Sequence, residues 1–467
     1  MSIPQSPTRR RFLSEALGAG VGVAGATAFG PRFAAEAMAA AMSPSQVSSA
    51  PEGAKKPLRV AAIVTEVAYR LHPHVIIENF IEPYIFNGKR TESGCRIVSL
   101  YVDQVRDIDM SRAISRAYDI PIVPTIAEAL TLGGKSLEVD GVLSIGEHGE
   151  YPSNEMAQMA YPHKRFFDEI VAVFEKTGQT APVFNDKYLS YRFDWGREMV
   201  ATADRLGFAL MAGSSVPLAE RRPPLELPSG AKMVEAVSIH GGPLERYDFH
   251  GFEVLCSMVE GRQGGETGIK AVRFLEGDAL WNAADQGLWS LKLADAAFAA
   301  EIGPGKPSIR ELVKTPAYSA LLPYGTLIEF NDGLKGLVLR IGKASTRWNF
   351  ACQLADDPQP RVTRFHVGPW ENRNLFKALS HAIQTCFRDR ESPYPIERTL
   401  MSTGLIDAMM ISRHGKGMRL ETPELAKVVY QPRDFAAMRE NGESWRRLGD
   451  NAPQPRGVDS YDRHFLE

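Results

Sequence analysis

The sequence predicts an α/β protein, with a Rossmann-like parallel-sheet domain followed by an α+β domain that has a mostly antiparallel open sheet. Over residues 58–217, short apolar strands alternate with amphipathic helices and short turns, as in parallel sheets with right-handed crossovers. Over residues 218–431, period-two strands and hairpin turns take over. A proline-rich stretch at 220–230 marks the boundary between these two patterns.

The first domain supplies alternating strands and helices. Its expected strands are 59–64, 95–103, 120–124, 139–147, 181–186 and 208–216. Its expected helices are 72–85, 109–120, 126–132, 165–178 and 195–207, the last two ending at glycines. In the second domain we expect strands at 232–242, 268–278, 325–342 and 347–354, with Asn331-Asp332-Gly333 as a hairpin turn. A helix at 249–262 is embedded early, and the helices are expected on one face of the sheet.

Composition and charge narrow the class of protein. The 467 residues are 44% apolar and 24% charged, with a net charge of -2, which is ordinary for a globular protein of about two domains. This near-neutral charge does not indicate a surface that binds nucleic acid or an anionic membrane. The four cysteines have no CxxC spacing, which excludes a zinc ribbon. One disulfide bond between them is possible if the protein is exported.

The N-terminus predicts export. Residues 8–13, TRRRFL, match the twin-arginine signal at every position, and a short glycine- and alanine-rich segment follows. That segment is too short for a stable membrane span. We therefore expect a signal peptide at 1–42, a polar linker at 43–57, a surface-wrapping tail at 432–467, the twin-arginine translocase as a partner, and a periplasmic or extracellular location.

Several motifs resemble the Gfo/Idh/MocA family of glucose-fructose oxidoreductases and inositol dehydrogenases, over most of residues 58–412. The fourth expected strand ends in Gly146-Glu147-His148, where that family has a turn beside the nicotinamide. APVFNDKYLS resembles the segment with the Glu-Lys-Pro motif: Asp186 and Lys187 match, and Tyr188 replaces the proline. GGPLERYDFHGFE resembles the motif that ends in the catalytic histidine, with Arg246 where an acid is expected four residues before it.

The resemblance implies an oxidoreductase-like enzyme, with NAD or NADP, acting on a sugar or polyol. Lys187 and His250 would perform acid-base and alkoxide chemistry, and Asp186 would orient Lys187. Four further residues would bind the substrate: Glu147, His148, Tyr188 and Glu253. By analogy we also expect a homo-oligomer that assembles through the open face of the second sheet.

The first loop departs from a dinucleotide site. Such a loop needs glycines so that its backbone can approach the pyrophosphate, yet none occurs between Gly53 and Gly88. Thr65 and Glu66 stand in those places, and a carboxylate repels a pyrophosphate. Thr65 stays a candidate for cofactor contact, and Asp103 could accept a ribose hydroxyl or serve as a helix cap.

Two rivals to hydride transfer stay open. The same Lys187 and His250 could abstract a proton next to a carbonyl, as in a lyase, hydratase or epimerase of oxidised sugars. This version could be assisted by zinc or manganese held by a His/carboxylate set drawn from His72, His74, Glu147 and His148, although their spacing matches no named metal motif. A non-catalytic binding subunit that inherited the fold is the third alternative.

Overall fold

The computed structural model describes residues 56–448 and Val458, within one compact unit over residues 52–467. Two sheets organise this part of the chain, which confirms the predicted fold class. The expected signal peptide, nearly all of the expected linker and half of the expected tail lie outside the described residues. No helix within the described residues is long and apolar enough to cross a membrane.

The first sheet is parallel throughout, in the order β4-β1-β5-β6-β7. Its strands are β1 (Leu58–Val64), β4 (Cys95–Val102), β5 (Gly141–Ile145), β6 (Val183–Asp186) and β7 (Leu210–Gly213). The associated helices are α2 (His72–Ile81), α3 (Ser111–Tyr118), α4 (Ile126–Thr131), α5 (His163–Thr177) and α6 (Phe193–Leu206). The central strands β1 and β5 are almost wholly buried, which explains why they read as continuous apolar runs.

Two expected elements of this domain are shorter than predicted. The helix expected over 72–85 ends at Ile81, and a small hairpin follows, β2 (Tyr84–Phe86) with β3 (Lys89–Thr91). Pro83 lacks a backbone N–H and cannot continue the helix. The strand expected at 120–124 makes only one bridge, between Leu100 and Ile122. Pro121 and Pro124 remove the donors that a longer ladder needs.

The second sheet has eight strands in the order β15-β10-β11-β12-β9-β13-β14-β8, and only the β12–β9 pair is parallel. The strands are β8 (Glu220–Arg222), β9 (Met233–His240), β10 (Ile269–Glu276), β11 (Tyr324–Phe330), β12 (Lys335–Arg340), β13 (Trp348–Leu354), β14 (Arg361–His366) and β15 (Leu420–Glu421). Cys256 and Cys352 are buried in its core, and all four cysteines are free.

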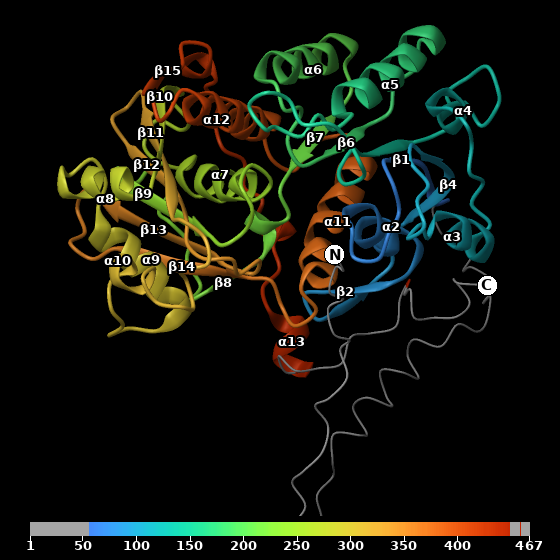
Figure 1. Ribbon diagram of the computed structural model, residues 1–467. Helices are drawn as coiled ribbons and strands as arrows, with labels where there is room; N and C mark the ends of the chain where they lie inside the picture. The colour runs from blue at the N-terminus through green and yellow to red at the C-terminus, as the bar shows by residue number, and fades with distance from the viewer. Residues whose placement is uncertain (1–55, 449–457, 459–467) are drawn as a thin grey trace, which may run out of the picture. The chain divides into compact units, whose positions relative to one another are not determined.

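Helices cover both faces of this sheet, so the expectation of helices on one face was wrong. On one face lie α7 (Arg246–Val259) and α12 (Ile396–His414). On the other lie α8 (Asp278–Asp285), α9 (Leu291–Ile302) and α10 (Ile309–Leu312), packed on the alternate residues of β9 and β12 (Figure 1). The face on which the predicted homo-oligomer depended is therefore covered by the chain itself, and oligomer formation stays a prediction.

After β14 the chain returns to the first sheet, before α12 and β15 complete the second. Helix α11 (Asn372–Asp389), orange in Figure 1, packs beside α2, in blue, and shares a hydrophobic core with β1 and β4. The last described helix is α13 (Glu443–Leu448), and short 3-10 turns lie at Val216–Leu218, Leu425–Lys427 and Ala436–Met438. Because α11 is contributed from far along the chain, the parallel sheet depends on the second half of the sequence for its packing.

We predict that Gly141→Ala destabilises the protein by about 1–3 kcal/mol, because a β-carbon at Gly141 would lie 2.6 Å from the Phe387 ring of α11. Gly261→Ala is the control, since its added carbon meets nothing within 4 Å. Denaturant unfolding of both variants measures the difference. Equal free energies of unfolding would show that α11 does not pack tightly on β5.

Candidate active site

The candidate site lies at the carboxyl ends of β5 and β6, where ligands meet parallel sheets. Glu147 and His148 follow β5, and Lys187 follows β6 directly. Helix α7 brings His250 to the same place from the second half of the chain. Lys187, His148 and His250 all line one cavity of about 360 Å³. The structure thus brings the predicted lysine and histidine to a common space.

Lys187 is held by a buried ion pair. Its Nζ lies 2.9 Å from Oε2 of Glu147, and the two side chains are 5% and 1% exposed. His163 on α5 lies 3.3 Å from the other carboxylate oxygen. Burial alone would raise the pKa of Glu147, but the charge of Lys187 and the hydrogen bond with His163 outweigh it and lower that pKa. Glu147 is therefore a carboxylate and a fixed counterion for the lysine.

Asp186 has a different partner from the one predicted. Its Oδ2 lies 2.6 Å from Nδ1 of His72, at the start of α2, so Glu147 rather than Asp186 orients Lys187. The His72 ring in turn lies edge-on to His148, with ring centroids 4.9 Å apart. Burial, followed by the charges of His72 and Lys187, lowers the pKa of His148 well below its ordinary value.

His250 is a buried, neutral imidazole. Its Nδ1 lies 2.6 Å from the Ser214 hydroxyl, which follows β7. Burial and then the charge of Lys187 lower the pKa of His250 well below 6.5. Nε2 makes no hydrogen bond within the described part of the chain, which leaves it as the nitrogen available to a substrate. An uncharged imidazole of this kind can accept a proton at neutral pH.

Three of the four residues expected to bind substrate do not line this cavity: Glu147, Tyr188 and Glu253. Glu253 is buried one turn after His250 and accepts hydrogen bonds from the Ser402 hydroxyl at 2.5 Å and the Ser214 amide at 3.3 Å. Tyr188 is fully buried between the His163 and Phe249 rings. Glu253 therefore joins α7, α12 and the end of β7, and Tyr188 supports the wall behind Lys187.

Backbone strain concentrates around the site. Five of the eleven non-glycine residues with positive φ in the described chain lie on the cavity wall or directly behind it. They are Arg70, His148, Lys187, Glu245 and Glu371. Such strain recurs at functional sites, where the surrounding structure holds side chains in directions that a relaxed backbone would not give.

The place of the dinucleotide pyrophosphate is occupied by the protein's own groups. Glu66, in the first loop, is 2% exposed and forms two hydrogen bonds with Arg106, at 2.5 and 2.7 Å. The backbone N–H of Gly149, in the loop after β5, donates to the same carboxylate at 3.0 Å. The Thr65 hydroxyl donates to the carbonyl of Glu147 at 2.5 Å. These bonds connect the first loop to the loop after β5.

The ribose position is occupied in the same way. One carboxylate oxygen of Asp103 accepts the Tyr151 hydroxyl at 2.6 Å. The other accepts the Tyr101 hydroxyl at 2.7 Å and Arg165 at 2.6 Å. Neither Thr65 nor Asp103 lines the cavity, which reaches the first loop only at Arg70 and His72. The residues of this groove do not fit a nicotinamide dinucleotide.

The described residues contain no group of three or more His, Cys, Asp or Glu side chains placed to hold a metal ion. His72 and His74, which were candidates for a pair of ligands, have different partners. His74 is fully buried; its Nδ1 accepts the Arg70 amide at 2.9 Å, and its Nε2 contacts the Val458 carbonyl.

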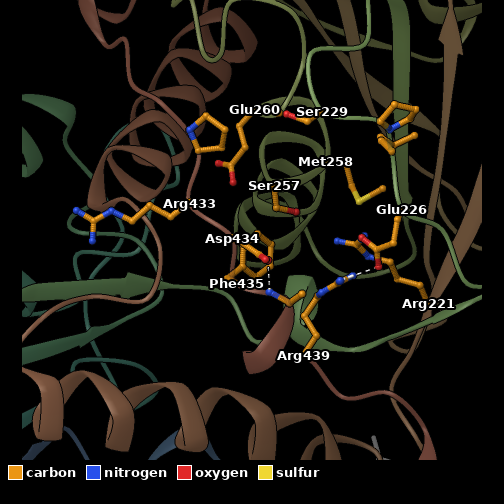
Figure 2. Close-up of a pocket in the computed structure, with 15 residues that line it drawn as sticks. Arg221, Glu226, Ser229, Ser257, Met258, Glu260, Arg433, Asp434, Phe435 and Arg439 are labelled. Carbon is orange, nitrogen blue, oxygen red and sulfur yellow. Dashed lines mark hydrogen bonds and ion pairs between the residues drawn. The ribbon is translucent and has the colours of Figure 1, made fainter.

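A second cavity, of about 180 Å³, lies beside the end of α7 and the segment 432–439 (Figure 2). Arg221 and Arg439 both contact Glu226 there, at 3.2 and 2.6 Å. Burial, and then the charge of Arg439, lowers the pKa of Arg221 to about 10. The acidic and basic side chains that line this second cavity largely neutralise one another. None of its lining residues is a nucleophile paired with a base.

No protein-family model and no curated protein matches the chain. Solved structures that resemble it include GenD2 from gentamicin A biosynthesis in complex with NAD, at 13% identity, covering 80% of this chain and 99% of that one, with a TM-score of 0.49. Another is myo-inositol 2-dehydrogenase from Lactobacillus plantarum, at 10% identity, 78% and 99% coverage, TM-score 0.47. A third is scyllo-inositol dehydrogenase from Lactobacillus casei with NAD(H) and scyllo-inositol, at 10% identity, 78% and 99% coverage, TM-score 0.48.

Two of these neighbours are inositol dehydrogenases, a type that the sequence resemblance named, and GenD2 is in complex with NAD. At this identity and TM-score they carry no conclusion about activity, and the fold assignment rests on the strand orders above.

Several residues at the site carry no signal in the local sequence. His163, Ser214 and Trp348 are buried beside Glu147, His250 or the cavity, and nothing in their local sequence marks them. Arg246 carried a signal, because it replaces an expected acid four residues before His250. Its position on the cavity wall gives that replacement a meaning.

We predict that Glu147→Gln lowers the free energy of unfolding by about 3–5 kcal/mol at pH 7, because it leaves the buried Lys187 charge without a counterion. Since the pKa of Glu147 is lowered on folding, its contribution is fully present above its ordinary value of 4.5 and decreases as the pH falls below it. Urea unfolding from pH 7 to pH 3 should show the two proteins converging.

The control for that series is Glu138→Gln, which removes an exposed ion pair with Arg59 and should change stability little. A wild-type advantage over Glu147→Gln that grows as the pH falls would contradict the assignment of Glu147 as a carboxylate.

Proposed function

We propose that the protein is an exported enzyme that moves a proton at the carbon next to a carbonyl group of an oxidised sugar, as a lyase, hydratase or epimerase. One observation carries this proposal. The groove for a dinucleotide is closed by the protein's own hydrogen bonds, while the cavity beside it contains a lysine ammonium and a neutral imidazole. Export rests on the twin-arginine motif alone.

In this mechanism His250 is the base. Its Nδ1 is engaged by Ser214, so Nε2 takes the proton from the carbon next to the carbonyl. The electron pair of the broken C–H bond moves into the carbonyl, and negative charge develops on the carbonyl oxygen. The Lys187 ammonium stabilises that oxygen, and the Glu147 carboxylate holds the lysine in place.

The intermediate can then follow two routes. A proton returned to the opposite face of the carbon gives the epimer. Alternatively, a hydroxyl group on the next carbon departs as water, after receiving a proton from His72. The Asp186 carboxylate fixes the orientation of that imidazole through Nδ1. The reverse of this second route is hydration.

A second candidate is the hydride-transferring sugar or polyol dehydrogenase that the sequence resemblance implies. The meeting of Lys187 and His250 at one cavity favours it, because these two positions match the family's lysine and histidine. It requires the loops around Glu66 and Gly149 to separate so that NAD or NADP can enter.

We predict that the purified full-length protein contains no dinucleotide. Mass spectrometry of the small molecules released on denaturation should detect no NAD or NADP. Isothermal titration with either oxidised cofactor should show no binding at millimolar concentration. Stoichiometric dinucleotide in either measurement would reverse the order of the two candidates.

We also predict that Lys187→Met and His250→Asn each slow solvent-deuterium incorporation next to the carbonyl of a keto sugar by about 10²–10⁴-fold. NMR with a panel of keto sugars and keto sugar acids measures the exchange. The controls are Lys314→Met and His414→Asn, which change exposed side chains elsewhere. Because burial keeps His250 neutral, the acid limb of the rate profile should lie below pH 6.5.

Exchange that is equally fast in Lys187→Met and wild type would contradict this mechanism. Absence of exchange with every substrate of the panel, together with sugar binding that both variants retain, would favour the third alternative, a non-catalytic binding subunit.

A further inference from the structure

The cavity has an excess of positive charge. Three cationic side chains line it, Arg70, Lys187 and Arg246, against a single carboxylate, Glu371. Arg70 is paired with Glu371 at 2.5 Å, and Lys187 is paired with Glu147 behind the wall. Arg246 makes no ion pair and no side-chain hydrogen bond within the described residues. The charge left over at this cavity is therefore the guanidinium of Arg246.

Arg246 is the first residue of α7, and its place in the helix determines how it can act. The backbone N–H groups of the first turn are already used: Arg246 and Tyr247 donate to the carbonyls of Leu244 and Pro243. Glu245 and Asp248 cap the helix reciprocally. An anion at this helix end would therefore be bound by the Arg246 side chain, with the helix dipole adding to the attraction.

The Arg246 charge acts on a group beside the proposed reacting residues. It contributes to the lowered pKa of His148, after burial and the charges of His72 and Lys187. His148 and Arg246 both line the cavity. A ligand held by Arg246 would thus extend toward His148, Lys187 and His250.

Two further residues that line this cavity have buried polar atoms without partners. The indole Nε1 of Trp348 and the hydroxyl of Ser215 belong to residues that are 3% and 1% exposed, and neither atom has a hydrogen-bond partner within residues 56–448 and Val458. The Nε2 atom of His148 is buried without a partner as well. Buried polar atoms in proteins are normally hydrogen-bonded. An indole N–H can only donate, so these groups select a ligand rich in acceptor oxygens.

Resting on the function proposed above, we infer that the substrate is a sugar acid whose carboxylate is bound by Arg246. The carbonyl end of the molecule then lies at Lys187 and His250, and its hydroxyl oxygens accept from Trp348 and Ser215. A single unpaired guanidinium matches one carboxylate in charge and in its two-pronged geometry. A volume of about 360 Å³ suits a monosaccharide rather than an oligosaccharide.

The test compares acid and neutral sugars of matched configuration on the full-length protein. Isothermal titration is performed with D-glucuronate and D-galacturonate, and with D-glucose and D-galactose as their neutral counterparts. Wild type should bind at least one acid about 10–100-fold more tightly than its neutral counterpart, as expected for a hydrogen-bonded charge pair. Raised salt should weaken only the binding of the acid.

Arg246→Gln should remove this preference and leave binding of the neutral sugar unchanged, while Arg246→Lys should retain part of it. Arg205→Ala, an exposed arginine on α6, is the matched control and should behave as wild type. Unfolding midpoints equal to wild type exclude a folding defect, since Arg246 is exposed.

Equal binding of acid and neutral sugar by wild type, or a preference that survives in Arg246→Gln, would overturn the inference. Failure of all four sugars to bind would also overturn it. Deuterium exchange separates this result from the proposed function. Exchange on neutral keto sugars that depends on Lys187 would keep the proton-transfer mechanism and reject only the carboxylate.

Discussion

The buried ion pair between Lys187 and Glu147 is the interaction on which the candidate site depends. It connects the ends of two neighbouring parallel strands, and it keeps an ammonium group where solvent scarcely reaches. That charge helps to keep His250 and His148 neutral, after the larger effect of burial. One pair therefore supplies the group proposed to stabilise negative charge and contributes to the neutrality of the proposed base.

The first loop places a carboxylate of the chain itself where the resemblance implies a dinucleotide phosphate. Glu66 receives an arginine and a backbone N–H, which are the kinds of donors that a bound phosphate receives. The carboxylate thus acts as an internal anion. Its bond to Gly149 also fixes the loop after β5. Glu147 and His148, which directly precede Gly149, belong to the candidate site. Closing the groove and orienting the cluster are two effects of one set of contacts.

The second half of the chain completes the site as well as the fold. Helix α7 contributes His250 and Arg246, and α11 packs against α2, at whose start His72 lies. The cavity wall therefore combines residues from both sheets. Helices on both faces of the second sheet leave the proposed site at the junction of the two sheets, where α7 begins.

The sequence by itself determined the alternation of strands and helices, the missing glycines, and the candidacy of Lys187 and His250. These features are local, because the burial of a strand, amphipathic spacing and turn chemistry depend on residues that are close in the sequence. It also placed His148 and Glu147 at the end of a strand, because parallel strands present their carboxyl ends at one edge.

Only the tertiary structure decided which groups pair. Glu147 and Lys187 are 40 residues apart, and His72 and Asp186 are 114 apart, so no local pattern could assign these partners. The same holds for Tyr188 and Glu253, whose burial depends on helices contributed from elsewhere in the chain. Charge pairing and burial are properties of three-dimensional packing, and they give a lysine, a histidine and an arginine their separate roles.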